Sequence, residues 1–269
     1  MRPEKGSTSG TSYSICGPET VASQTLVFIH GVGLNQQIWQ PQIEHFSRHY
    51  QVLVYDMLGH GDSQLPVEGA TLDDYVAQLA DLLESLQLDQ VIVVGHSMGA
   101  LVSVAFALAY PEKVIALVPM NIVYQRSTEQ RKAVMARAAK VLADGEIAGV
   151  DGALSRWFAD KTDPESLAKI DLVRRWMLAV DPVGYGRTYR LFSVSDDAFS
   201  GRLGQLSMPV LYLTGDNDPN STPAMSIQMA EETPNGWAAS IPDEAHMMAY
   251  ISPEVTNRTI EFFLKEFLE

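Results

Sequence analysis

Five short apolar runs, separated by segments of helical pattern, most constrain the fold of this 269-residue chain. The runs are TLVFIH (25–30), QVLVYD (51–56), QVIVVG (90–95), VIALVPM (114–120) and PVLYLTG (209–215). None alternates regularly between apolar and polar residues, which is typical of strands buried on both faces of a parallel sheet. Parallel strands need crossover connections, and these are usually helices. The sequence therefore predicts an α/β protein with a doubly wound, mostly parallel sheet.

The segments between these runs have the period of amphipathic helices. After Thr71, a good capping residue, apolar side chains recur at steps of three and four up to Leu86, so one face of this helix is expected against the sheet. A second helix is expected over residues 97–109 and a last one over 252–267. The run GWAASIP (236–242) is the expected last strand.

A helical lid is expected between the fourth and fifth apolar runs. Only helical patterns occur there, over residues 127–145 and 163–180. About 85 residues between two strands is far more than a crossover of about 10 to 15 residues needs. The segment 122–205 has 13 basic and 11 acidic residues, whereas the whole chain has a formal charge of −14. We therefore predict a core of residues 1–121 and 206–269 and an inserted lid of residues 122–205.

The acidic composition excludes some classes of partner. A charge of −14 disfavours non-specific binding to nucleic acid or to an anionic membrane, since both require a positive surface. The polar first residues and the absence of a long apolar run predict a cytoplasmic protein. The partner expected is a small-molecule substrate, with no nucleic acid and no membrane. Cys16 is the only cysteine, so no intrachain disulfide is possible. The oligomeric state is left open.

A serine lies where the third apolar run ends. In open parallel sheets, reactive groups gather beyond the carboxyl ends of the strands. Ser97 is there, between Gly95 and Gly99 in VGHSMGA. The pattern G-x-S-x-G between a strand and a helix is that of a nucleophile elbow, which exposes the serine Oγ above the helix N-terminus. The alternative is a glycine-rich turn with an incidental serine. We expect Ser97 to be a nucleophile.

A serine nucleophile requires a base, and histidine is the usual one. His246, in IPDEAHMMAY (241–250), follows the expected last strand. The order serine, acid, histidine along the chain is that of α/β hydrolases. The other five histidines are expected to be solvated (His45 and His49) or structural (His30, His60 and His96).

The acid and the oxyanion donors are expected at neighbouring strand ends. Asp218 and Asp216 both follow Gly215, which closes a strand. Asp218 is favoured because the third residue after the glycine suits a turn that aims back at the histidine, and Asp216 is the alternative. An oxyanion requires N–H donors. These are expected from Met98, directly after the serine, and from Val32 in the glycine-containing loop HGVGLN.

Five motifs in order resemble the α/β-hydrolase superfamily: FIHGVG, YDMLGHGDS, GHSMGA, GDND and EAH. The resemblance covers about residues 25–120 and 209–269, and it is greatest to 3-oxoadipate enol-lactonase and related carbon–carbon bond hydrolases. It implies an α/β-hydrolase fold with Ser97, Asp218 and His246 as catalytic triad, Val32 and Met98 as oxyanion donors, no metal and no organic cofactor.

The chain also differs from parts of this superfamily. A serine at the elbow disfavours the dehalogenases and epoxide hydrolases, which have an aspartate there. Some relatives take the acid from the end of the strand after the nucleophile, but that position is Asn121 here. The leading strands of the family would have to fit into residues 11–24, where no clear hairpin is seen.

The substrate is expected between the elbow and the lid. An arginine-rich lid in an acidic protein suggests a carboxylate-bearing substrate, although solvated arginines on helix faces are the alternative. The function predicted is serine hydrolysis of a small ester or lactone. The alternatives are carbon–carbon or amide cleavage with the same triad, or a receptor-like protein with little turnover. Candidate pocket residues are Tyr124, Arg126, Trp157, Trp176, Arg187, Tyr189, Arg190 and Phe192.

Overall fold

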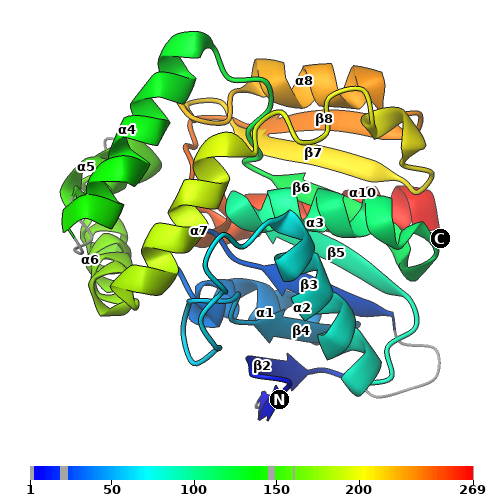
Figure 1. Ribbon diagram of the computed structural model, residues 1–269. Helices are drawn as coiled ribbons and strands as arrows, with labels where there is room; N and C mark the ends of the chain where they lie inside the picture. The colour runs from blue at the N-terminus through cyan, green and yellow to red at the C-terminus, as the bar shows by residue number, and fades with distance from the viewer. Residues whose placement is uncertain (1–2, 19–23, 145–148, 160, 269) are drawn as a thin grey trace.

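The computed structural model describes residues 3–18, 24–144, 149–159 and 161–268 (Figure 1). Within them one sheet has the strand order β1-β2-β4-β3-β5-β6-β7-β8. The first two strands are antiparallel to their neighbours, and every later pairing is parallel. The strands are β1 (Glu4–Thr8), β2 (Thr11–Cys16), β3 (Thr25–Ile29), β4 (Gln51–Tyr55), β5 (Val91–His96), β6 (Val114–Met120), β7 (Val210–Gly215) and β8 (Gly236–Ile241).

Both faces of the sheet are covered by helices, as the continuous apolar runs predict. Along β3, Val27 and Ile29 belong to the core on one face, and Leu26 and Phe28 belong to the core on the other. Helices α2, α3 and α8 pack on the first face, and α1 and α10 pack on the second (Figure 1). These helices are α1 (Gln40–Phe46), α2 (Leu72–Ser85), α3 (Met98–Ala109), α8 (Pro223–Glu232) and α10 (Pro253–Leu268).

Short helical turns connect several of these elements. They are η1 (Gln36–Trp39), η2 (Pro111–Lys113), η3 (Leu203–Gln205) and α9 (Met248–Ile251). Helix α2 begins as predicted at Thr71, whose capping box with Asp74 satisfies N–H groups at the first turn. No helix in the part of the chain that the structure describes is long and apolar enough to span a membrane.

The N-terminal hairpin is a correction to the sequence analysis, which found no clear hairpin near residues 11–24. Strands β1 and β2 pair through a two-residue loop, with Thr8 opposite Thr11. Ser9 and Gly10 have φ values of 47° and 74°, as a type I′ hairpin turn requires. The hairpin begins earlier than expected, and its turn signal is the dipeptide Ser9-Gly10.

Four helices, here called the lid helices, come between β6 and β7 in the chain and lie together at one end of the sheet (Figure 1). The sequence predicted only two of them. The predicted end of the first helix, Gly145, lies outside the described residues, and the second begins after Asp163, which caps it. The boundaries 122–205 of the lid stay a prediction. The lid helices are α4 (Thr128–Asp144), α5 (Val150–Phe158), α6 (Pro164–Ala179) and α7 (Pro182–Val194).

Candidate active site

Ser97 lies on a strained turn between β5 and α3. Its φ and ψ are 57° and −114°, a conformation that costs free energy for a residue with a side chain. The Ser97 N–H donates to the carbonyl oxygen of Met120 at 2.9 Å, which ties the turn to β6. A Cβ on Gly95 would clash with the backbone of Gly99, and one on Gly99 would clash with the backbone of Ile29. Both glycines of the motif are therefore required by close backbone packing.

The structure brings Asp218 and His246 together from the ends of β7 and β8. The distance from His246 Nδ1 to Asp218 Oδ2 is 2.7 Å, and both side chains are buried. Burial alone would raise the pKa of Asp218, but His246 and the donors of Asn121 and Asn220 hold it below its ordinary value. The alternative acid, Asp216, is exposed.

His246 contacts two other rings. The His96 ring centroid is 4.8 Å from that of His246, and the Trp157 centroid is 5.8 Å away. Burial and the neighbouring His246 lower the pKa of His96 to about 3, so His96 is neutral and its Nε2–H donates to the His246 carbonyl oxygen at 2.8 Å. The sequence analysis treated His96 as structural, and the structure shows that it contacts the histidine directly.

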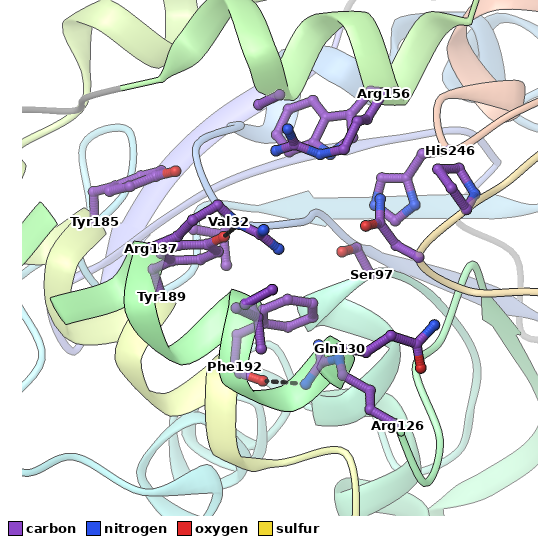
Figure 2. A pocket seen from close by; sticks show the side chains of 16 residues that line it. Val32, Ser97, Arg126, Gln130, Arg137, Arg156, Tyr185, Tyr189, Phe192 and His246 are labelled. Carbon is purple, nitrogen blue, oxygen red and sulfur yellow. Dashed lines mark hydrogen bonds between the residues drawn. The ribbon is translucent and has the colours of Figure 1, made fainter. Parts of the chain in front are cut away.

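A cavity of about 250 Å³ lies between the strand ends and the lid helices (Figure 2). Its floor comes from residues that follow four parallel strands, namely Val32, Ser97, Asn220 and His246. Ser97 and His246 face this cavity together, although no hydrogen bond joins them in the structure. Met98 is the first residue of α3, so its N–H is one of those that a helix leaves unpaired at its N-terminus.

The sequence matches the alpha/beta hydrolase fold family over residues 24–253. The chain belongs to this family. It is 37% identical over 90% of both chains to the (E)-2-((N-methylformamido)methylene)succinate hydrolase of Acinetobacter baylyi. It is 27% identical to the 3-oxoadipate enol-lactonase 2 of the same organism, over 90% of this chain and 89% of that one.

Among solved structures, the enol-lactonase of Burkholderia xenovorans has a TM-score of 0.86 at 24% identity, covering 97% of this chain and all of that one. That likeness concerns the fold. Together with the hydrolases and lactonases among its relatives, it confirms the predicted fold and makes the chain an α/β-hydrolase-fold enzyme.

Four of the predicted lid residues line the cavity of this hydrolase: Arg126, Trp157, Tyr189 and Phe192. Arg126 is held in place, because its guanidinium lies 3.2 Å from an oxygen of buried Asp196 and above the Phe192 ring. Its positive charge is therefore largely compensated within the protein.

The structure does not bring Tyr124, Trp176, Arg187 or Arg190 to this cavity. The Tyr124 hydroxyl donates to Glu232 at 2.5 Å, and Trp176 packs against Tyr250. Arg187 donates to the carbonyl oxygen of Pro66 at 2.6 Å. The Arg187 contact joins α7 to the core, and no local pattern in the sequence reveals it.

Two further arginines line the cavity and were not predicted. Arg137 on α4 and Arg156 on α5 extend toward the space in front of Ser97 (Figure 2). Burial and the positive charge of Arg137 lower the pKa of Arg156, although an arginine stays charged. For Arg137 the sequence did hold a signal. Gln130, Ala133, Val134 and Arg137 recur at steps of three and four and so share one face of a helix, and all four line the cavity.

Metal binding finds no support in the described part of the chain, where no three His, Cys, Asp or Glu side chains gather in a way that would hold an ion. The polar groups of the residues that line the cavity are the Ser97 hydroxyl, two tyrosine hydroxyls, the His246 imidazole, the Trp157 indole, amides and guanidinium groups. This set suits nucleophilic attack and anion binding.

Proposed function

We propose that this enzyme is a serine hydrolase that cleaves a carboxylic ester or lactone in a small carboxylate-bearing molecule. Ser97 is the nucleophile, His246 the general base and acid, and Asp218 the group that orients the histidine. One observation carries the proposal: His246 is bound through Nδ1 to buried Asp218 at 2.7 Å and faces the same cavity as Ser97.

The first half of the reaction forms an acyl-enzyme. Because Nδ1–H of His246 donates to Asp218, Nε2 is free to accept the proton of the Ser97 hydroxyl. As Oγ bonds to the carbonyl carbon, the carbonyl oxygen becomes an oxyanion and accepts hydrogen bonds from the N–H groups of Met98 and Val32. The bond to the leaving oxygen then breaks, and that oxygen takes the proton from Nε2.

The second half releases the acid. A water molecule gives one proton to Nε2 of His246 while its oxygen bonds to the acyl carbon. The second tetrahedral intermediate collapses, the bond to Oγ breaks, and Ser97 recovers its proton from the histidine. No oxidant, reductant or metal enters these steps, and the net reaction adds one water across the acyl bond.

The arginines of the cavity support a carboxylate on the substrate. Arg137 and Arg156 form no ion pair with an acidic residue in the described regions, and the residues that line the cavity include no acid. Two guanidinium groups of like charge repel each other in a partly buried site. A substrate carboxylate would remove this repulsion and accept charge-assisted hydrogen bonds.

Amide cleavage is the second candidate, and the 37% identical relative favours it. Its name denotes a substituted formamide built on succinate, whereas the 27% identical relative is named for a lactone of 3-oxoadipate. Both names contain a dicarboxylate skeleton. The same serine and histidine would serve either bond, with nitrogen in place of oxygen as the leaving atom.

Turnover by the purified protein tests the proposal. We expect hydrolysis of p-nitrophenyl acetate, 3-oxoadipate enol-lactone or (E)-2-((N-methylformamido)methylene)succinate, and the ratio of their kcat/KM values separates ester from amide cleavage. Ser97→Ala should lower kcat at least about a thousandfold. Ser103→Ala, on the same helix but hydrogen-bonded to Ala100, is the matched control. If Ser97→Ala hydrolysed these substrates as fast as the wild type, the proposed role of Ser97 as nucleophile would be refuted.

A further inference from the structure

Asn121 is rigidly held where β6 ends. It is fully buried, and its φ of 50° is in the left-handed region that asparagine tolerates better than most residues. Its N–H donates to the carbonyl oxygen of Leu213 at 2.8 Å, and its own carbonyl oxygen accepts the Ser221 hydroxyl at 2.7 Å. The backbone of Asn121 is therefore fixed between β6 and the loop that follows β7.

The orientation of the Asn121 amide is decided by its neighbours. Its Nδ2 lies 2.9 Å from Asp218 Oδ2 and 3.3 Å from Thr214 Oγ1. An ionised carboxylate only accepts hydrogen bonds. The Thr214 hydroxyl donates its single proton to the Ser221 carbonyl oxygen at 2.7 Å, so it also accepts here. Both neighbours require a donor, and the amide must present Nδ2 to them.

This orientation leaves Asn121 Oδ1 buried with no hydrogen-bond partner in the described structure. An unpaired buried acceptor destabilises the folded protein. This cost offsets part of what the two hydrogen bonds of Nδ2 contribute to stability. Its position beside Asp218 indicates a role in the site.

The two oxygens of Asp218 are held by different groups. Oδ1 accepts from the backbone N–H groups of Asn220 at 2.8 Å and Ser221 at 3.2 Å. Oδ2 accepts from His246 Nδ1 at 2.7 Å and from Asn121. Among the described residues, Asn121 is thus the one partner of Oδ2 besides the histidine itself. It fixes where that oxygen lies when His246 moves a proton.

We propose that Asn121 is a positioning residue, which directs the Oδ2 oxygen of Asp218 toward His246 through its side-chain N–H. The inference rests on the proposed function, in which the Asp218–His246 pair serves Ser97. Asn121 does not touch the substrate cavity, so its removal should lower kcat and leave KM unchanged. The donor, and not the size of the side chain, is what the site requires.

Asn121→Asp tests this requirement, because it keeps the shape and the tolerance of a positive φ but replaces the donor with an acceptor. Two carboxylates side by side cannot both ionise easily. The variant should therefore lose kcat by roughly tenfold to a hundredfold and show an additional ionisation in its pH–kcat profile that the wild type lacks. Asn121→Gly, which removes the amide without backbone strain, should lose kcat similarly without the extra ionisation.

Thr214→Val is the matched control, since it disturbs the same buried network but leaves the hydrogen bond between Asn121 and Asp218. We expect its kcat within about twofold of the wild type. Rates are measured on p-nitrophenyl acetate. The proposal is overturned if both Asn121 variants keep the kcat and the pH profile of Thr214→Val.

A second readout needs no turnover. The proton between His246 Nδ1 and Asp218 should give a downfield proton NMR signal, assigned by its loss in His246→Gln. We expect this signal to shift or vanish in Asn121→Asp and to persist in Thr214→Val. An unchanged signal in Asn121→Asp would refute the positioning role. A shifted signal combined with hydrolysis that does not depend on Ser97 would keep the positioning role and reject the proposed function.

Discussion

At the scale of single residues, the arginines of the cavity differ in how their charge is compensated. Arg126 is paired with Asp196, which is fully buried and also binds Arg131. Arg156 has no acidic partner among the residues described and faces Arg137 across the cavity. Arg137 also has no acidic partner there, but its Nε–H donates to the Tyr189 hydroxyl at 3.2 Å. We therefore expect Arg156, more than Arg137 or Arg126, to bind the carboxylate of the proposed substrate.

We predict that Arg156→Gln weakens the use of carboxylate-bearing substrates. Loss of a charge-assisted hydrogen bond should lower kcat/KM for 3-oxoadipate enol-lactone by roughly tenfold to a hundredfold. The loss should be much smaller for p-nitrophenyl acetate, which has no carboxylate. Arg175→Gln is the control, because Arg175 is solvent-exposed and paired with Asp171 on α6. Equal losses on both substrates would contradict carboxylate binding by Arg156.

The sequence predicted the residues of the site unevenly, for a physical reason. Ser97, Asp218 and His246 each follow a strand, and the strand ends of a parallel sheet meet at one edge. Arg137 and Arg156 reach the cavity only because the lid helices dock there, which depends on tertiary packing. Asn121 also follows a strand, and the sequence placed it where some relatives have the acid, but its hydrogen bond to Asp218 depends on the side-chain geometry between two strand ends.

At the scale of elements, α7 approaches the core closely through a glycine. A Cβ on Gly184 would clash with the backbone of Gly59, which itself has a positive φ. Nearby, the hydroxyl of Tyr75 on α2 and that of Thr188 on α7 lie 2.7 Å apart. This docking places Tyr185 and Tyr189 at the cavity. The sequence analysis missed α7 because its two glycines, Gly184 and Gly186, weaken its helical pattern.

Two substitutions on α7 separate docking from helix propensity. Gly184→Ala should lower the free energy of unfolding by about 1–3 kcal/mol through overpacking against backbone, and it should lower kcat/KM. Gly186→Ala is the matched control, since its Cβ would come too close only to the end of the Leu142 side chain, which is flexible, and not to backbone. It should be neutral or raise stability by up to about 1 kcal/mol. Urea unfolding of both variants tests this, and equal effects would contradict the docking argument.

At the scale of the whole molecule, three buried histidines tie stability to pH. In His30 and His60, Nε2 accepts the N–H of Met57 and of Gly33, and Nδ1 contacts a carbonyl oxygen. These bonds require the neutral ring. Burial lowers the pKa of His30 from 6.5 to about 4 and that of His60 to about 3, and His96 is lowered similarly.

We therefore predict that the protein loses stability as the pH falls below about 6.5. The unfolded chain binds a proton on each of these histidines near their ordinary pKa of 6.5, whereas the folded protein does not until about pH 4 or below. Because the unfolded state binds more protons in this window, the free energy of unfolding decreases as the pH decreases, by at most about 4 kcal/mol per pH unit for three protons.

Urea unfolding at about pH 7, 6 and 5 measures this slope of the free energy of unfolding against pH. His60→Gln should make the slope shallower by about one proton, and His49→Gln, which changes an exposed histidine, should not. An identical slope in His60→Gln and the wild type would show that His60 is protonated equally in both states.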